Sequence, residues 1–274
     1  MKNLQKSILL LASIVLVSCS KDDSPAVTPT APIDYSTEAA VSGQFQRNVL
    51  IEDYTGTWCG YCPRMAYGIQ KVEEQGIRAI PVALHGGSNT EPFLYSGTLP
   101  LNISGYPTGR LNRQSDWDFF SLSDVDRVKK LNGNNCPIGI AMNSTITGSL
   151  VNLDVKVKFN SDFTGLKLVV YVVEDGLSYT QTNYTSYYGG GSSIPGFIHD
   201  NVLRVCYTDI HGDVLNGTTN GATVTKNFSV NVPSNVQNVA NMRFVAFVID
   251  SNGKAINVRE TNSSVENQAF EVNP

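Results

Sequence analysis

The chain has 274 residues, a formal net charge of −4 and a pI near 5.4. This slightly acidic balance lacks the basic character typical of nucleic-acid binding, so we expect no nucleic-acid partner. Charged residues make up only 16% of the chain, and glycine is frequent with 23 residues, as expected of an exported protein rich in strands and turns. The length suffices for one large or two ordinary domains.

The N-terminus predicts an export signal. Lys2 and Lys6 precede an apolar run over 8–17, which is about half of the ~20 residues that span a bilayer. A charged start, a short apolar core and then small residues are typical of a secretory signal. Residues 24–32 then carry three prolines among small side chains, which is typical of an extended tether. We expect a signal and lipidation segment over 1–19 and a flexible tether over 20–44.

Strands alternate with helical stretches from residue 45 to 133. Met65, Ile69 and Val72 fall at i, i+4 and i+7 and predict one face of a helix that stops at Gly76. Pro81 lies inside an apolar run and favours a strand edge or a bulge. The expected elements are a buried strand over 49–51, this helix, a strand over 77–84, a loop leading into a strand over 102–110, and a helix over 123–133. Such alternation predicts an α/β domain.

From Cys136 onward the helical spacing disappears. Short apolar runs are separated by turn signals, including Ser-Asn-Gly at 251–253. The expected strands are 138–146, 150–159, 166–173, 201–208, 223–232, 243–249 and 254–259. Their pattern predicts an antiparallel β-sandwich over 134–274. A stretch rich in Tyr, Gly and Ser, 179–193, interrupts it, and we expect an exposed loop there. The whole chain is therefore predicted to be α+β with two domains.

Cys59 and Cys62 form a C-x-x-C motif between a predicted strand and a predicted helix. A zinc site needs four Cys or His ligands; the chain has no second C-x-x-C and its three histidines are scattered, so we expect no metal and no other cofactor. At a helix N-terminus, unpaired N–H groups stabilise a thiolate. We therefore expect Cys59 to be an exposed nucleophile and Cys62 to be the resolving thiol of a redox pair.

The stretch DYTGTWCGYC, residues 53–62, resembles the active site of the thioredoxin superfamily. The resemblance covers about residues 45–133 and implies a thioredoxin-like domain there. It implies a buried acid at Asp53 and a cis-proline at Pro107, in the GYPT stretch 105–108. The Gly-Tyr dipeptide between the cysteines is similar to that of bacterial disulfide isomerases. The implied catalytic residues are Cys59, Cys62, Asp53 and Pro107, and the implied substrate-binding residues are Trp58, Tyr61 and Tyr106.

The complete layout is similar to that of the outer membrane protein 28-related lipoprotein family. The features that carry this resemblance are the segment Leu-Val-Ser-Cys ending at Cys19, the tether, TGTWCGYCPR, GYPTG, a β-rich second half and FIHDNVLR at 197–204. The resemblance implies a lipid on Cys19 and a location at the outer membrane, which the protein contacts through this anchor. Residues 20–23, Ser-Lys-Asp-Asp, resemble a tag for export to the cell surface, but the tag is short and leaves both membrane faces open.

Several residues keep two interpretations. Strand alternation places one of Glu52 and Asp53 inside, and the six-residue spacing to Cys59 favours Asp53. Cys136 and Cys206 are predicted to form a disulfide that closes a loop of about 70 residues, the alternative being two separate buried thiols. For His199 and Asp200, next to each other in sequence, we expect a hydrogen-bonded structural pair.

Two functions remain open. In the first, the protein exchanges disulfides with protein thiols and disulfides of the cell envelope. In the second, it is a non-enzymatic binding or structural lipoprotein at the surface, and Cys59–Cys62 is a permanent structural disulfide. A structural disulfide needs neither the acid at Asp53 nor the proline at Pro107, which favours the first function.

Overall fold

The computed structural model describes residues 33–274. The predicted signal, Cys19 and the tether as far as residue 32 lie outside these residues. The remainder of the predicted tether contacts the folded chain: Tyr35, in the short helix η1 (Tyr35–Thr37), donates its N–H to the carbonyl of Lys130 at 2.9 Å, and the Val41 N–H bonds Asn135 Oδ1 at 2.8 Å. No helix within 33–274 is long and apolar enough to cross a membrane.

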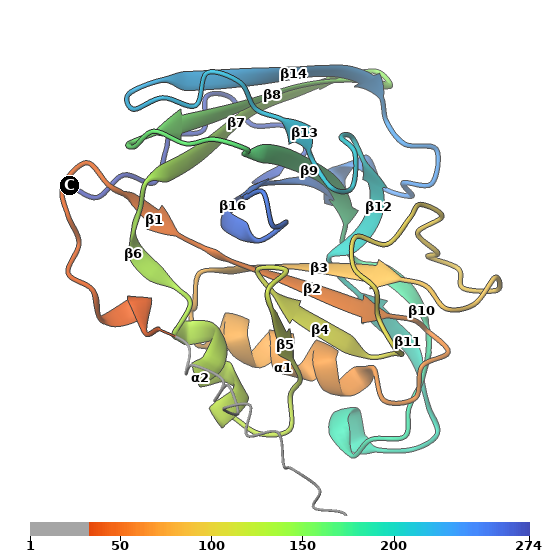
Figure 1. The fold of residues 1–274 in the computed structure, drawn as a ribbon. Helices are drawn as coiled ribbons and strands as arrows, with labels where there is room; N and C mark the ends of the chain where they lie inside the picture. Colours follow the sequence, from red (N-terminus) through yellow and green to blue (C-terminus); the bar gives the residue numbers. More distant parts are fainter. Residues whose placement is uncertain (1–32) are drawn as a thin grey trace, which may run out of the picture. The chain divides into compact units, whose positions relative to one another are not determined.

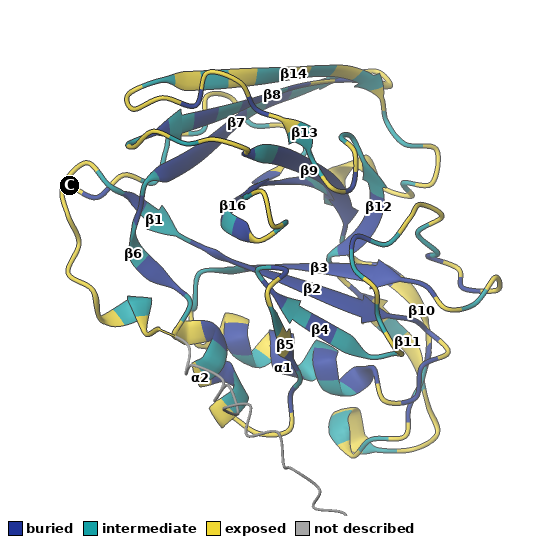
Figure 2. Ribbon diagram, in the orientation of Figure 1, coloured by how far each residue is buried: buried dark blue, intermediate teal, exposed yellow. Residues whose placement is uncertain are grey.

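A nine-stranded mixed sheet forms the centre of the fold (Figure 1). Its strand order is β16-β15-β9-β12-β3-β2-β4-β5, with β13 paired to β9. Its strands are β2 (Val49–Thr55), β3 (Ala79–His85), β4 (Thr108–Leu111), β5 (Ser115–Trp117), β9 (Lys167–Glu174), β12 (Val202–Cys206), β13 (Asp213–Val214), β15 (Met242–Ile249) and β16 (Ala255–Asn262). β2 is buried along its whole length and β9 along nearly all of it (Figure 2), because both faces of each strand are covered.

The first predicted region supplies one end of this sheet. β2 runs parallel to β3 and antiparallel to β4, which pairs with β5. Helix α1 (Pro63–Glu74) connects β2 to β3, and α2 (Ser123–Lys129) follows β5. The predicted helix stop at Gly76 is confirmed, since Gly76 has a φ of +64°, a conformation that glycine adopts without strain. A core of α1, α2 and the near face of β2 holds this region together, with Val49, Ile51 and Met65 fully buried.

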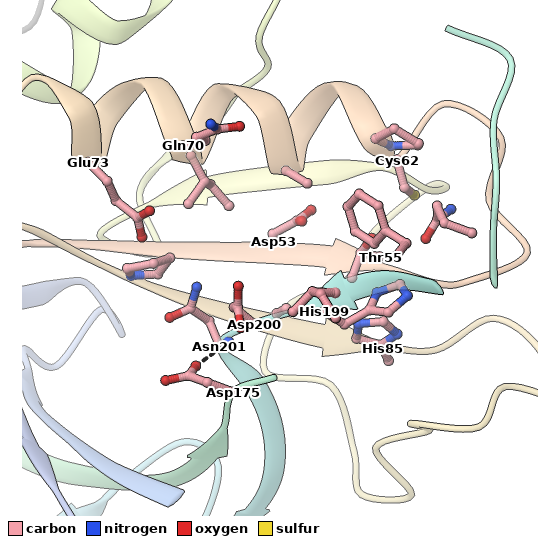
Figure 3. Close-up of a pocket in the computed structure, with 18 of the residues that line it drawn as sticks. Asp53, Thr55, Cys62, Gln70, Glu73, His85, Asp175, His199, Asp200 and Asn201 are labelled. Carbon is pink, nitrogen blue, oxygen red and sulfur yellow. Dashed lines mark hydrogen bonds between the residues drawn. The ribbon is translucent and has the colours of Figure 1, made fainter. Parts of the chain in front are cut away.

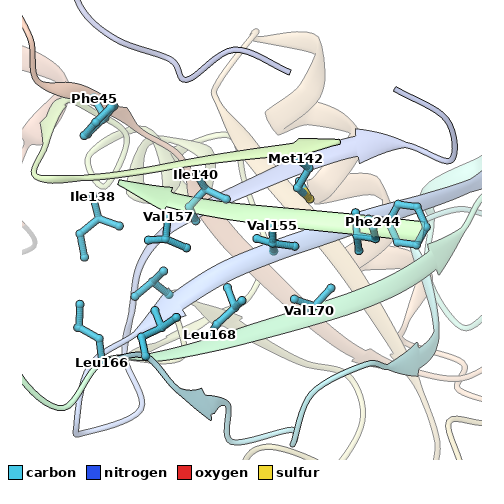
Figure 4. Close-up of a cluster of buried hydrophobic side chains, with 14 of the residues drawn as sticks. Phe45, Ile138, Ile140, Met142, Val155, Val157, Leu166, Leu168, Val170 and Phe244 are labelled. Carbon is cyan, nitrogen blue, oxygen red and sulfur yellow. The ribbon is translucent and has the colours of Figure 1, made fainter. Parts of the chain in front are cut away.

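In the second region two sheets pack face to face as a sandwich. A three-stranded sheet of β7 (Ile138–Thr147), β8 (Leu150–Phe159) and β14 (Thr223–Asn231) covers one face of β9 and β15. Figure 4 shows side chains of β7, β8, β9 and β15 in the core between the two sheets. Val155 and Val157 from one sheet pack with Leu168, Val170 and Phe244 from the other. Every second residue of β8 is buried from Val151 to Phe159, which is why alternation located this strand from the sequence. The β-rich character predicted for this half is confirmed.

Strands from both regions meet in the same sheet. Val202 of β12 pairs with Ala83 of β3, and the far faces of β9 and β15 share an apolar core with β2 and β3. The N–H of Asn48 also bonds Asn257 Oδ1 of β16 at 2.9 Å. The boundary predicted between residues 133 and 134 stays a prediction, because one layer of the sandwich continues directly into the sheet of the first region.

The predicted exposed loop at 179–193 is wrong in part. Residues on either side of its centre form a hairpin of β10 (Leu177–Thr182) and β11 (Ser193–His199). Gln181 and Asn183 are buried within it, because this hairpin lies against the C-x-x-C segment. The remaining elements are β1 (Phe45–Arg47), which pairs with β6 (Gly133–Cys136), and the short helices η2 (Tyr187–Gly189) and η3 (Val239–Asn241).

Candidate functional site

Cys59 and Cys62 form a disulfide at the start of α1, with their Cα atoms 5.4 Å apart. The chain leaves β2 at Thr55 and reaches Pro63, the first residue of the helix. Proline is favoured there because the first helical N–H has no partner inside the helix. The other unpaired N–H groups of the first turn and the positive end of the helix dipole stabilise a thiolate at this position.

The prediction of an exposed Cys59 is wrong. Its exposed fraction is 3%, and that of Cys62 is 2%. The hairpin lies along this segment: the Tyr184 N–H donates to the Gly60 carbonyl at 2.7 Å, and Gln181 Nε2 donates to the Cys59 carbonyl at 2.9 Å. The Tyr184 ring lies directly against Gly60. The sequence separation of about 120 residues between these partners explains why the motif alone did not predict the cover.

Glu52 and Asp53 are both buried, with exposed fractions of 0% and 3%. The prediction that only one lies inside is wrong because β2 is an interior strand with both faces covered. Glu52 forms an ion pair with Arg113 at 3.1 Å and accepts a hydrogen bond from the Tyr171 hydroxyl at 2.9 Å. Asp53 lines a cavity with Cys62. Burial, and secondarily the charge of Asp118, raises the pKa of Asp53 to about 8.

The Tyr106–Pro107 peptide bond is cis, as predicted. It directly precedes β4, whose first residue, Thr108, pairs with Tyr54 of β2. Tyr106 lies edge-on to Trp58 with their ring centroids 5.5 Å apart, and Trp58 Nε1 donates to the Gly86 carbonyl at 2.9 Å. The structure therefore brings two of the predicted substrate-binding residues together.

Tyr61, the third predicted substrate-binding residue, lies apart from this pair. Its ring is 5.7 Å from that of Tyr184 in the hairpin. Tyr61 is 54% exposed and Trp58 is 42% exposed. Exposed aromatic rings therefore flank the buried disulfide on the side of Tyr106 and on the side of the hairpin.

Glu91 is a site residue that the sequence analysis missed. Its Oε1 lies 3.0 Å from His85 Nδ1, while its Oε2 accepts hydrogen bonds from the Thr57 N–H at 2.7 Å and from the Thr57 hydroxyl at 2.9 Å. Burial alone would raise the pKa of Glu91, but the contacts with His85 and Thr57 outweigh it and lower this pKa. Glu91 thus holds the segment before Cys59 against the end of β3. Nothing in its local sequence indicates this role.

The predicted pair of His199 and Asp200 does not form. Asp200 Oδ1 accepts from the Gly176 N–H at 2.8 Å, whereas the His199 ring lies 5.3 Å from the ring of His85. Burial, followed by the proximity of His85, lowers the pKa of His199 to about 3, so this side chain is neutral at pH 7. Across residues 33–274, no group of three or more His, Cys, Asp or Glu side chains is placed to hold a metal ion.

The predicted disulfide between Cys136 and Cys206 is also wrong. Both are free thiols. Cys136 is part of the sandwich core, whereas Cys206 packs on the opposite side of β9, against the core shared with β2 and β3, with its sulfur 3.4 Å from the Thr208 hydroxyl. A layer of sheet therefore separates the two. Burial raises the pKa of each thiol, which makes both poor nucleophiles.

Comparison with known proteins identifies the class. The family described as Outer membrane protein Omp28 matches residues 100–267, which is more than half of the 274 residues. The chain belongs to this family, and its location is the outer membrane. The matched segment begins after the C-x-x-C motif, so family membership by itself gives no role to Cys59 and Cys62. No curated protein sequence matches the chain.

Among solved structures, HBP35 of Porphyromonas gingivalis is similar with a TM-score of 0.65 and 21% sequence identity, over 85% of this chain and 81% of that one. This likeness shows a shared fold. A domain of the outer membrane lipoprotein Omp28 from Porphyromonas gingivalis gives a TM-score of 0.31 at 18% identity, over 48% of this chain and 91% of that one. The second likeness is too low to support a structural argument.

Proposed function

We propose that the protein is a thiol–disulfide exchange protein of the outer membrane, with Cys59 and Cys62 as its redox pair. The observation that carries this proposal is the Cys59–Cys62 disulfide at the first turn of α1, with the buried carboxyl group of Asp53 in the adjoining cavity. A helix N-terminus favours thiolates, and a carboxyl group of raised pKa can exchange a proton near neutral pH.

The arrangement of the first region supports the same proposal. The chain order β2-α1-β3-β4-β5-α2, with the strand order β3-β2-β4-β5 in the sheet, resembles that of a thioredoxin-like domain and supports the proposal. The disulfide follows the first of these strands, and Pro107 precedes the third. Trp58 and Tyr106, which meet at the surface, would contact a bound partner chain.

The reaction would take place in two steps. The Cys59 thiolate attacks a partner disulfide, so that a mixed disulfide forms and one partner thiolate leaves. Cys62 then attacks the Cys59 sulfur, which closes the disulfide and releases the second partner thiolate. Two electrons pass from the cysteine pair to the partner, and Asp53 in its carboxylate form accepts the proton of Cys62. Attack by Cys59 requires the hairpin to move away from Gly60.

A second candidate function is supported by the burial of both sulfurs. With exposed fractions of 3% and 2%, Cys59 and Cys62 could form a permanent structural disulfide in a binding lipoprotein. Such a disulfide would link the end of β2 to α1 and would take no part in exchange. The two functions differ in whether Cys59 ever carries a partner.

The Cys62→Ser variant decides between them. It retains the attacking thiol and lacks the resolving thiol, so mixed disulfides should accumulate on Cys59 and should migrate as reducible high-mass species. Cys59→Ser should give far fewer such species than Cys62→Ser, and Cys136→Ser, which removes a buried free thiol, should behave like the native protein. Absence of trapped species from Cys62→Ser cells would leave the structural disulfide as the remaining function.

The same proposal includes a lipid on Cys19, which lies outside the described residues. A lipid-anchored protein should partition with the membrane fraction, because stable attachment requires acyl chains on the protein. Cys19→Ala should release the protein in soluble form. Retention of Cys19→Ala in washed membranes would contradict the anchor without affecting the redox proposal.

A further inference from the structure

A groove with a volume of about 680 Å³ runs along one side of α1 (Figure 3). Its floor includes Ala79, Pro81 and Ala83 of β3, whose small side chains leave this space unfilled. Over 79–82, β3 pairs only with β2, since its contact with β12 is at Ala83. The volume is within the range of ligand-binding pockets.

The groove extends over the length of α1. Cys62 lines one end and Glu73 the other, and Cys59 is absent from its lining. The two residues are separated by 11 positions of the chain, and at about 1.5 Å per residue they lie about 16 Å apart. An extended peptide of about five residues spans this distance. Cys62, although only 2% exposed, is therefore the half of the disulfide that borders the groove.

The end of the groove at Cys62 is buried and contains unpaired polar atoms. Asp53 and His199 are 3% and 6% exposed. Among the described residues, Asp53 Oδ1 and His199 Nε2 have no hydrogen-bond partner. Buried polar groups ordinarily have partners, so these two atoms indicate a ligand with polar groups close to Cys62.

The opposite end of the groove is acidic. Glu73 and Asp200 are exposed there. Asp175 and Glu260 also line it and both form ion pairs with Arg243, the one arginine in the lining. Four carboxylates against one guanidinium leave this end negative, which attracts a positively charged ligand.

We propose that the groove binds an extended, positively charged peptide segment whose cysteine reduces the disulfide by attack on Cys62. This inference rests on the proposed function and names the substrate class of one half-reaction. The cysteine of the segment occupies the buried end beside Asp53, and a basic residue about four positions away occupies the acidic end. The reduced protein uses Cys59 on partner disulfides, and the oxidised protein receives electrons through Cys62.

The half-reaction balances with the peptide as reductant. A peptide thiolate attacks the Cys62 sulfur, the Cys59–Cys62 bond breaks, and Cys59 leaves as a thiolate that takes a proton from water. A second peptide thiolate attacks the sulfur of the bound peptide, so that a peptide disulfide leaves and Cys62 becomes a thiolate. Asp53, whose pKa is about 8, supplies the proton to Cys62 from its protonated form. Two thiols are oxidised and one disulfide is reduced.

Three peptides test the charge preference: acetyl-Cys-Ala-Ala-Ala-X-amide with X as Lys, Gln or Glu, together with the same series in reverse order. The charge lies far from the thiol, so the three peptides have similar thiolate fractions. At low ionic strength the Lys peptide should reduce the native protein about tenfold faster than the Glu peptide, and 1 M salt should remove the difference. Equal rates for Lys and Glu peptides in both orders would overturn the proposal.

Variants locate the effect. In the double variant Glu73→Gln, Asp200→Asn, the Lys and Glu peptides should reduce the disulfide at equal rates. The control Glu74→Gln should retain the tenfold difference in rate, because Glu74 lies outside this groove and pairs with Lys71. Persistence of the full preference in the double variant would overturn the proposal.

Single-cysteine variants locate the point of attack. In Cys59→Ser, the remaining Cys62 should exchange with a 2-thiopyridyl derivative of the Lys peptide about tenfold faster than with that of the Glu peptide. Cys59 in Cys62→Ser should show less than a twofold preference, and a preference confined to Cys59 would overturn the proposal. If peptide charge has no effect while Cys62→Ser still traps partners, the groove proposal fails and the proposed function stands. If no peptide reduces the protein and no partner is trapped, the proposed function itself fails.

Discussion

Replacement of Asp53 by Asn should change how the stability of the fold depends on pH. The pKa of Asp53 is about 8 in the folded chain, against an ordinary value of 3.8. Between these values the folded chain keeps a proton that the unfolded chain releases, so rising pH favours unfolding. Each pH unit in this interval lowers the free energy of unfolding by about 1.4 kcal/mol. Asn is nearly isosteric with the protonated carboxyl group and does not titrate.

The size of the effect follows from the two pKa values. From pH 5 to pH 8, the free energy of unfolding of Asp53→Asn minus that of the native protein should rise by about 3.5 kcal/mol. Urea unfolding of both proteins, with the disulfide kept oxidised, measures this difference at each pH. Subtraction removes all titrating groups that the two proteins share, including His199, whose contribution has the opposite sign below pH 6.5.

Parallel stability profiles of the two proteins from pH 5 to pH 8 would refute this reasoning. They would mean that Asp53 titrates alike in the folded and unfolded chains, and that its carboxyl group is solvated through the groove. The proton transfers assigned to Asp53 would then lack their physical basis. A rise of several kcal/mol in the difference would support them.

Three other changes follow from the structure. From pH 6 to pH 4, the free energy of unfolding of the native protein should fall by about 2.5 kcal/mol through His199, because the unfolded chain binds a proton that the buried imidazole, with a pKa of about 3, does not bind. His199→Gln should remove this decrease. Equal pH dependence of acid unfolding in both proteins would contradict the prediction. Arg113→Met should lower the free energy of unfolding by about 3–5 kcal/mol because it leaves the Glu52 carboxylate buried without its ion pair. In urea unfolding, the double variant with Glu52→Gln should be more stable than Arg113→Met alone. Additive losses from the two substitutions would contradict this. Gly60→Ala places a methyl group against the Tyr184 ring and should displace the hairpin, so reduced Cys59 should be alkylated several-fold faster than in the native protein. The control Gly105→Ala, whose methyl group meets nothing within 4 Å, should not alter the rate. Equal rates in all three proteins would show that the hairpin does not control access to Cys59.

Local patterns were sufficient to predict most of the elements. The alternation from Leu150 to Phe159 gave the bounds of β8, since one face of that strand packs on the sandwich core. The apolar spacing of Met65, Ile69 and Val72 gave α1 because these side chains face the sheet. In each case the periodicity of the sequence reports a single buried face, and this face is a property of the segment itself.

Long-range contacts account for what the sequence did not predict. Glu52 lies beside Asp53 in a strand covered on both faces, and its partners Arg113 and Tyr171 come from distant segments. The cover over the disulfide depends on Gln181 and Tyr184, whose neighbourhood is polar and gives no periodic signal. Glu91 acts through Thr57, 34 positions away. Such pairings are set by tertiary packing, so no local spacing indicates them.

The reduction potential of the Cys59–Cys62 pair decides whether this disulfide takes part in exchange. Equilibration of the protein with defined ratios of reduced and oxidised glutathione, followed by alkylation and mass measurement, gives this potential. A redox-active pair should lie between about −270 mV, as in reducing thioredoxins, and about −120 mV, as in strong oxidants. We expect a value within that interval for Cys59–Cys62. A value well below about −300 mV, the range of structural disulfides in secreted proteins, would contradict it.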